Sequence, residues 1–240
     1  MKRLGVIGGM GPASTAYFYE LLTRFAGADT DQGHPETLII SRPSIPDRTA
    51  FLTGRGADPA PHIIKAGREL AGMGAELIAI PCVTAHCFYD RLAAGISVPV
   101  IDMVRQTALR LKDMGVKTAG IMATEGTIRC GVFSGGLNAL GIRAVTPPPG
   151  VQERVTSLIY NCVKAGRPPD MDAFEAAAGW LAANGSETVV LACTELSLIM
   201  RASAAPRGRF VDALECLAVC SLKLCGAAVT EPEALRNQKG

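Results

Sequence analysis

Two cysteines that hold the same position in two similar segments are the residues whose type and spacing point most directly to chemistry. Residues 74–82 and 185–193 each start with a glycine, a small residue and a glutamate, continue as an apolar run, and reach Cys82 or Cys193 eight residues after the glycine. Each run has the length of a buried parallel strand, so each cysteine is expected just past a strand's carboxyl end, where open α/β sheets bind ligands. If two halves of the chain face each other, the thiols flank one cleft and can exchange protons with opposite faces of one carbon atom.

The residues that follow these two cysteines favour ionised thiols. Thr84 and Thr194 are polar residues able to begin a helix, and a helix N-terminus stabilises a thiolate and lowers the pKa of the cysteine. The plainer interpretation of any cysteine is a small buried hydrophobe. We assign that role to the other six cysteines, Cys87, Cys130, Cys162, Cys216, Cys220 and Cys225.

A stiff loop over residues 43–49 carries an arginine suited to anion binding. Pro43 and Pro46 restrict the backbone, so Arg48 can be held in one direction. Its guanidinium presents a planar fork that binds carboxylates at two points. A surface pair between Arg48 and Asp47 is the alternative interpretation.

Two glycine-containing loops are candidates for close approach to a small anion. Residues 8–12 follow the first predicted strand and open a helix, but Ser14 holds the third glycine position of a dinucleotide fingerprint, so that fingerprint is not satisfied. Residues 124–127 are the corresponding loop of the second half.

Lysine and metal-ligand candidates are less specific. Lys164 lies at a predicted helix C-terminus, where it compensates the helix dipole, and no phosphate-binding loop surrounds it to favour a cofactor-bearing lysine. Cys82, His86 and Cys87 match no usual zinc spacing, so no metal is expected.

Short glycine and proline punctuation between alternating strand and helix patterns predicts parallel α/β layers. Strands are predicted over residues 4–7, 37–41, 76–80 and 116–122, helices over 12–25, 61–73, 104–114, 152–165, 171–183 and 211–228, and a long polar loop over 42–61. The strand starting near Lys117 follows that near Lys2 by 115 residues, close to the 111 residues between the cysteines, which indicates an internal repeat. We expect two similar, pseudo-twofold related lobes, residues 1–99 plus 211–228 and residues 100–210, each a parallel sheet flanked by helices, with the active site in the cleft between them.

Composition argues for a globular enzyme rather than a nucleic-acid or membrane protein. The chain has 240 residues, of which 48% are hydrophobic and 19% charged, and its formal charge of +2 comes from scattered rather than clustered residues. The first residues have the pattern of a strand rather than a signal peptide, and the most apolar stretch, residues 214–229, is interrupted by charges. We therefore expect a cytoplasmic protein whose eight cysteines are reduced thiols.

Taken in order along the chain, residues 5–12, 34–49, 81–86, 123–127, 163–166 and 192–195 resemble the motifs of the aspartate/glutamate racemase family, the pyridoxal-independent amino-acid racemases, and most closely its aspartate racemase branch. This resemblance implies a cofactor-free isomerase, usually a homodimer, with Cys82 and Cys193 as the acid/base pair. It also implies that Arg48 and Lys164 hold the carboxylates of an acidic amino acid, and that Thr84 and Thr194 offer hydroxyl and backbone N–H donors. The remaining substrate-binding residues that it implies are Met10, Asp47, Thr49, Val83, Ala85, Thr124 and Thr127.

One departure from the family pattern affects the choice of substrate. The family usually has Asn where this chain has Val83, and valine can neither donate nor accept a hydrogen bond. Isomerisation or decarboxylation of another small dicarboxylic acid, and non-catalytic binding of a small acid, therefore stay open as alternatives to racemisation of aspartate or glutamate. Asp47 and Glu195 are expected to shift the pKa values of the thiols rather than to transfer protons.

Overall fold

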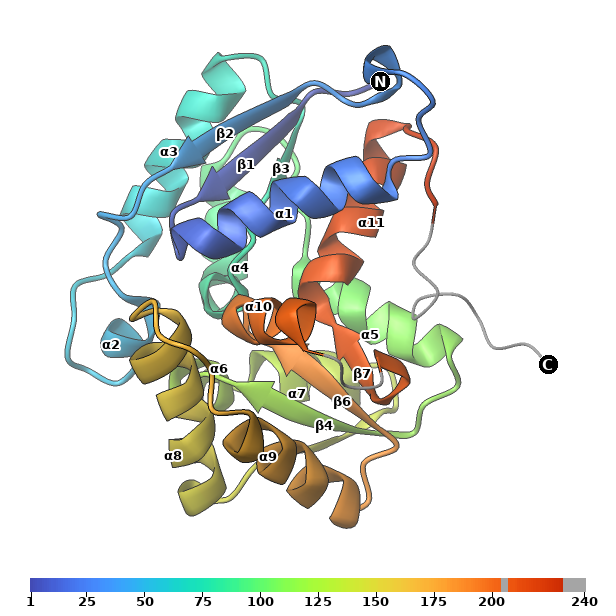
Figure 1. The fold of residues 1–240 in the computed structure, drawn as a ribbon. Helices are drawn as coiled ribbons and strands as arrows, with labels where there is room; N and C mark the ends of the chain where they lie inside the picture. The colour runs from blue at the N-terminus through green and yellow to red at the C-terminus, as the bar shows by residue number, and fades with distance from the viewer. Residues whose placement is uncertain (204–206, 231–240) are drawn as a thin grey trace.

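Two parallel β-sheets, one in each half of the chain, form the framework of the computed structural model, which describes residues 1–203 and 207–230 (Figure 1). The first sheet has the order β2-β1-β3 and consists of β1 (Leu4–Gly8), β2 (Thr37–Ser41) and β3 (Leu77–Ala79). The second has the order β5-β4-β6-β7 and consists of β4 (Thr118–Ala123), β5 (Arg143–Val145), β6 (Thr188–Ala192) and β7 (Phe210–Asp212). The strand before each site cysteine pairs with the first strand of its half, β3 with β1 and β6 with β4. The predicted α/β fold with two helix-flanked parallel sheets is confirmed.

Helices fill the space between the sheets and cover their outer faces (Figure 1). The layer between the sheets contains α1 (Pro12–Phe25), α5 (Met103–Asp113) and α11 (Ala213–Cys225). The outer face of the first sheet is covered by α3 (Ala60–Gly72) and α4 (Tyr89–Gly95), and that of the second by α8 (Pro149–Ser157) and α9 (Met171–Ala183). The remaining helices are α2 (Arg48–Leu52), α6 (Glu125–Cys130), α7 (Val132–Asn138) and α10 (Thr194–Ala202). The structure also contains the 3₁₀ turns η1 (Asp31–Gly33), η2 (Val83–Phe88) and η4 (Arg207–Arg209) and the π-helical segment η3 (Leu158–Val163).

The hydrophobic residues separate into one central core and two outer cores. Because side chains alternate along a strand, Val6 of β1 and Ile121 of β4 both enter the central core, where they meet the helices between the sheets. Their neighbours Ile7 and Met122 point the other way, into the outer cores of the first and second sheet. The central core therefore belongs to both halves of the chain.

The closing helix begins later than the sequence predicted. Residues 210–212 form β7, which pairs with β6, and Asp212 then caps α11 by accepting a hydrogen bond from the backbone N–H of Leu214 at 2.8 Å. α11 packs on α1 and α5, and its Cys225 carbonyl accepts from the N–H of Lys2. The lobe boundaries stay a prediction, and residues 204–206 of the expected second lobe lie outside the described residues.

Two further features differ from the sequence prediction or extend it. The predicted loop over residues 42–61 contains α2, because Asp47 caps that helix through the N–H of Ala50 at 2.7 Å. β5 and α7 were not predicted.

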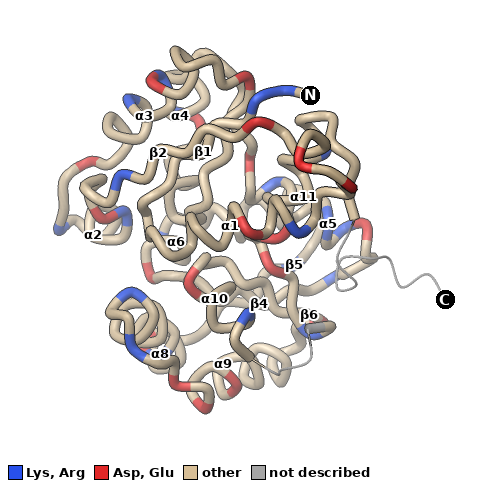
Figure 2. The backbone as a smooth tube through the Cα atoms, turned by 45° about the horizontal axis from the view of Figure 1, so that its top comes forward, with Lys and Arg blue, Asp and Glu red and all other residues tan. Residues whose placement is uncertain are grey.

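No helix in the described ranges is both long and apolar enough to cross a membrane. Lys and Arg alternate with Asp and Glu over both halves of the molecule (Figure 2).

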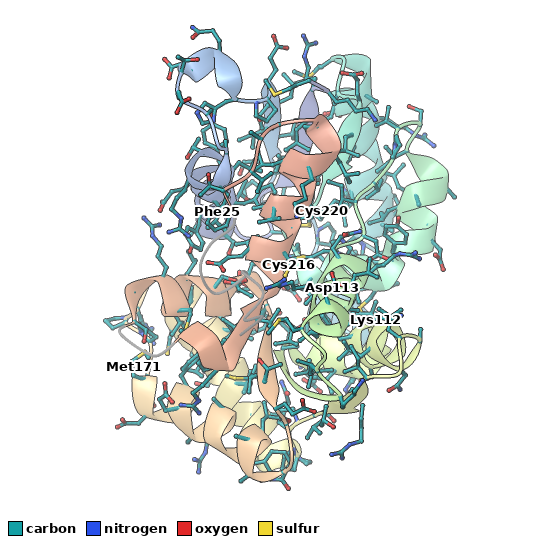
Figure 3. All side chains as sticks on the ribbon, turned by 90° about the vertical axis from the view of Figure 1, so that its right-hand side faces the viewer. Phe25, Lys112, Asp113, Met171, Cys216 and Cys220 are labelled. Atoms are coloured by element: carbon teal, nitrogen blue, oxygen red, sulfur yellow. A yellow bond between two sulfur atoms is a disulfide. The ribbon has the colours of Figure 1, made fainter. Side chains whose placement is uncertain are left out.

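Two cysteines of the closing helix have the packing role that was expected of them. Cys216 and Cys220 lie on the side of α11 that faces α5 (Figure 3). Cys216 is buried in the central core, and the half-buried Cys220 packs against it. Burial raises the pKa of both thiols, that of Cys220 to about 11, so both are protonated at neutral pH.

Candidate active site

A small enclosed cavity lies where the carboxyl ends of the strands of both halves come together. Its wall contains residues that follow β1, β3, β4 and β6, which is the position at which α/β sheets bind ligands. The lining residues are Met10, Asp47, Arg48, Thr49, Cys82, Val83, Thr84, Thr124, Tyr160, Lys164, Cys193, Thr194 and Glu195. About 10 Å³ is open to the centre of a water molecule, which is room for one water. A substrate therefore requires side chains of the wall to move.

The two site cysteines line this cavity from opposite halves of the chain. Cys82 follows β3 and precedes η2, whereas Cys193 directly follows β6 and precedes α10. Each is buried, with 5% of its surface exposed. The expectation that both thiols follow strand ends and reach one site is met by their position.

Cys193 is held as a hydrogen-bond donor by the second residue after it. Its Sγ donates to Oε2 of Glu195 at 3.0 Å, and Thr194 Oγ1 donates to the same oxygen at 3.3 Å. Burial and the negative charge of Glu195 raise the pKa of Cys193 well above its ordinary value. The predicted lowering of this pKa by the helix N-terminus is wrong for Cys193, because desolvation and the nearby carboxylate outweigh the helix dipole.

Arg48 is buried beside Cys82 and is fixed by backbone carbonyls. Its Nη1 donates to Ile45 O at 3.2 Å and to Pro46 O at 2.9 Å, and its Nη2 donates to Met10 O at 3.0 Å. Burial acts to lower the pKa of Arg48, but the adjacent Cys82 and the carboxylate of Asp47 raise it overall. Nε is buried and has no acceptor within residues 1–203 and 207–230, so its N–H is unpaired before a ligand binds.

Lys164 and Tyr160 approach the cavity from an unusual helical segment. The π-helical η3 continues α8, and the N–H of Lys164 donates to the carbonyl of Ile159, five residues earlier. Lys164 Nζ lies 2.6 Å from Glu195 Oε1, and Tyr160 donates to Oδ2 of Asp47 at 3.3 Å. Burial acts to lower the pKa of Lys164, but Glu195 and Cys193 raise it overall. Burial, aided by Asp47, raises the pKa of Tyr160 to about 12.

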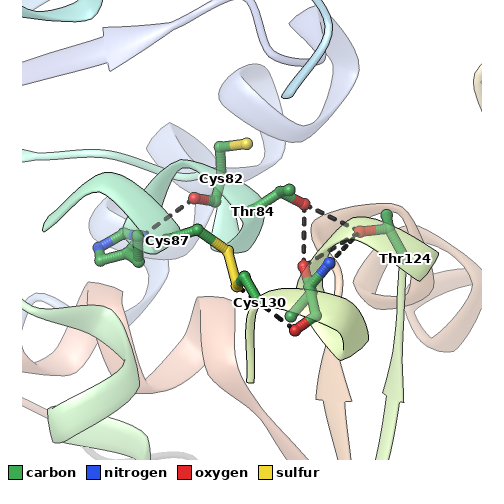
Figure 4. Close-up of a disulfide and its surroundings, with 7 residues drawn as sticks. Cys82, Thr84, Cys87, Thr124 and Cys130 are labelled. Atoms are coloured by element: carbon green, nitrogen blue, oxygen red, sulfur yellow. Dashed lines mark hydrogen bonds between the residues drawn. A yellow bond between two sulfur atoms is a disulfide. The ribbon is translucent and has the colours of Figure 1, made fainter. Parts of the chain in front are cut away.

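Three threonine hydroxyls join the two halves next to the cavity. Thr84 lies 3.0 Å from both Thr124 and Thr127, which are also 3.0 Å from each other, and Thr124 caps α6 through the N–H of Thr127. Behind this cluster, a disulfide connects Cys87 of η2 to Cys130 of α6 (Figure 4). The prediction that all eight cysteines are reduced is therefore wrong for this pair, which the packing of η2 on α6 brings together.

All but two of the substrate-binding residues expected from the sequence line the cavity. Ala85 is buried in the outer core of the first sheet, and Thr127 lies behind Thr84 and Thr124. Tyr160 was missed, although it precedes Lys164 by four residues on a predicted helix and so could have been placed on the same face. Glu195 was expected only to tune a thiol, yet it also binds Lys164.

The cavity residues do not form a metal site. No cluster of three or more His, Cys, Asp or Glu suited to a metal ion occurs in the part of the chain that the structure describes. The ring of His86 contacts the carbonyls of Cys82 and Ile101, at 3.0 and 3.3 Å.

A second, larger cavity adjoins the enclosed one. About 390 Å³ of it is open to water, and its walls include the loop after β1, the start of α1 and part of α10. It shares five lining residues with the enclosed cavity, Met10, Asp47, Arg48, Lys164 and Glu195. Through these shared residues, the outer cavity borders the wall of the cavity that holds the thiols.

Known proteins are similar to this chain over most of its length. The family model described as Asp/Glu/Hydantoin racemase matches residues 7–220. The broad specificity amino-acid racemase RacX of Bacillus subtilis is 27% identical over 204 residues, which cover 82% of this chain and 87% of RacX. The aspartate racemase of Picrophilus torridus has a similar structure, with a TM-score of 0.84, 28% identity and coverage of 98% of this chain and 99% of that one. An aspartate racemase homologue from Pyrococcus horikoshii gives a TM-score of 0.74 at 25% identity, covering 94% of this chain and all of the other.

Proposed function

The chain belongs to the Asp/Glu/hydantoin racemase family and is an amino-acid racemase, and we propose that it interconverts L- and D-aspartate or L- and D-glutamate by proton transfer between Cys82 and Cys193. The observation that carries this proposal is the placement of both buried thiols, one from each half of the chain, in the wall of one cavity together with two cations. No cofactor takes part in the proposed reaction.

In the proposed mechanism, one cysteine acts as a thiolate and removes the α-proton, while the other acts as a thiol and returns a proton to the opposite face. The two roles reverse for the other enantiomer. The carbanion requires its charge to spread into the α-carboxylate, which fixed donors around that group stabilise. We assign this role to Arg48, whose Nε is unpaired, and to the hydroxyls of Thr84 and Thr124, because all three residues line the cavity.

Two cations in the wall favour a substrate with two carboxylates. Arg48 and Lys164 both line the cavity, and guanidinium and ammonium groups are the usual partners of carboxylates in proteins. Val83 favours a second candidate, isomerisation of another small dicarboxylic acid, because its buried apolar side chain offers no hydrogen bond where an amide would. RacX, described as having broad specificity, shows that relatives of this chain are not confined to a single amino acid.

Reaction in deuterium oxide tests the proton-transfer pair. With L- or D-aspartate or glutamate, the parent enzyme is expected to incorporate deuterium at Cα as optical activity is lost. Cys82→Ala and Cys193→Ala should each lower racemisation by at least about 10²-fold, the contribution typical of a positioned proton-transfer group. Cys220→Ala, which changes a half-buried thiol on α11 away from the cavity, is the matched control. Racemisation at the parental rate by both site variants would refute the two-base mechanism.

Three further properties stay predictions. The resemblance to the aspartate racemase branch predicts a homodimer. We also propose a cytoplasmic protein that binds neither nucleic acid nor membranes, since its basic residues are scattered along the chain.

A further inference from the structure

The ion pair between Lys164 and Glu195 forms part of the wall between the enclosed cavity and the outer cavity. Both side chains line both cavities. Glu195 is buried, and its Oε1 lies 2.6 Å from Lys164 Nζ. A molecule that passes from the outer cavity to the thiols therefore meets this pair.

The site is electrically balanced before a substrate arrives. Its two cations, Arg48 and Lys164, lie in the same wall as two carboxylates, Asp47 and Glu195. Arg48 is fixed by three backbone carbonyls, and Asp47 is occupied by the start of α2 and by Tyr160. Lys164 and Oε1 of Glu195 instead hold each other, while Oε2 can keep its contacts with Cys193 and Thr194. This pair can therefore change partner at least cost in other contacts.

A free amino acid carries the same two charges as this ion pair. Its ammonium is complementary to Glu195, and a carboxylate is complementary to Lys164. We propose that an amino-acid substrate inserts its ammonium and a carboxylate between the two side chains, so that Glu195 selects for the amino group and Lys164 for the carboxylate. The inference rests on the proposed function, because it specifies how the same cavity recognises an acidic amino acid.

The position of Glu195 relative to Cys193 fits this arrangement. Oε2 of Glu195 lies 3.0 Å from Cys193 Sγ, and the ammonium nitrogen of an amino acid is bonded directly to Cα. An ammonium held by Glu195 therefore brings the reacting carbon to the Cys193 thiol. Its positive charge then lies directly beside that thiol, which favours ionisation of the thiol.

The loop after β1 leaves space for the pair to open. Gly11 lies against it, since a Cβ built on Gly11 would be 3.2 Å from Glu195 Oε1 and 3.9 Å from Lys164 Nζ. The absence of a side chain there lets the carboxylate and the ammonium separate without meeting the loop.

Binding measured by calorimetry distinguishes selection for the amino group from a purely structural ion pair. The intact enzyme is titrated with racemic aspartate, which undergoes no net reaction, and with succinate, which has the same two carboxylates and no amino group. Aspartate should bind at least about tenfold more tightly than succinate, the factor expected for one charged hydrogen bond.

Glu195→Gln gives the sharper result. Gln keeps the shape of the side chain but removes its charge, so aspartate should bind at least about tenfold more weakly. Succinate should bind as tightly as before or more tightly, because Lys164 no longer has an internal partner. Glu175→Gln, which removes a carboxylate from an exposed pair with Arg209, should change neither affinity.

Three results would count against the inference. Equal affinities of the parent enzyme for succinate and aspartate would show that the amino group is not selected, whether or not the variant folds. Equal weakening of both ligands by Glu195→Gln would show that the ion pair only maintains the fold. Failure of the parent to bind or racemise aspartate and glutamate would overturn the proposed function as well, whereas racemisation without discrimination against succinate would overturn this inference alone.

Discussion

Removing the Cys87–Cys130 disulfide should lower the free energy of unfolding by about 2 to 4 kcal/mol. The two cysteines are 43 residues apart in the sequence. Closing a loop of that length in the unfolded chain lowers its entropy by about 13 cal/mol/K, which corresponds to about 4 kcal/mol at 25 °C. The lower part of the range allows for residual structure in the reduced, unfolded chain.

The double variant Cys87→Ala/Cys130→Ala avoids leaving a free thiol and is the appropriate test. A loss of about 3 kcal/mol would move the urea midpoint by about 1 M if the m-value is near 3 kcal/mol/M. Treatment of the parent with dithiothreitol should produce a comparable shift and leave the double variant unaffected. Cys220→Ala controls for the loss of a cysteine side chain as such. A double variant that unfolds within about 0.5 kcal/mol of the oxidised parent would refute the loop-closure argument.

Three further changes test the site and its surroundings. Arg48→Lys should lower kcat/KM at least about tenfold in a racemisation assay, because one ammonium cannot reproduce the directions of a guanidinium held by three carbonyls; near-parental activity would contradict that role. Tyr160→Phe removes the hydrogen bond to Asp47 and should weaken substrate binding about two- to tenfold, with the unfolding free energy changed by about 1 kcal/mol or less; an unchanged affinity would show that this bond does not shape the site. Burial and the nearby Glu215 raise the pKa of Asp212 from its ordinary value of 3.8 to about 7. Between these two pH values, the folded protein therefore binds one more proton than the unfolded chain, so the free energy of unfolding should fall as the pH rises from 3.8 to about 7. Asp212→Asn should flatten this dependence in urea titrations at several pH values, and an unchanged slope would assign it to other groups.

The framework of the site was predictable because it follows from local patterns. The apolar runs before Cys82 and Cys193 are too short for typical helices and each follows a glycine turn, so parallel strands with cysteines at their carboxyl ends follow directly. Motif order then placed Arg48 and Lys164 among the residues around the thiols. Most of the expected residues do line one cavity.

The features that the sequence did not predict depend on non-local packing or on irregular backbone. The Cys87–Cys130 disulfide requires η2 to pack on α6, and nothing in the spacing of the two cysteines indicates this. The π-helical turn before Lys164 rotates the residues that follow it, so their direction differs from that in the regular α-helix that the sequence pattern predicts. The raised pKa of Cys193 depends on burial next to Glu195, which outweighs the helix-dipole effect that the local sequence suggests.

The central core makes the two halves of the chain depend on each other. Val6 and Ile121 come from different sheets and are buried in the same core. A polypeptide consisting of either half alone would expose this apolar face to water. The packing that covers the face also brings Cys82 and Cys193, which belong to different halves, to one cavity. Burial of apolar surface and the approach of the two thiols therefore have a common origin in this core.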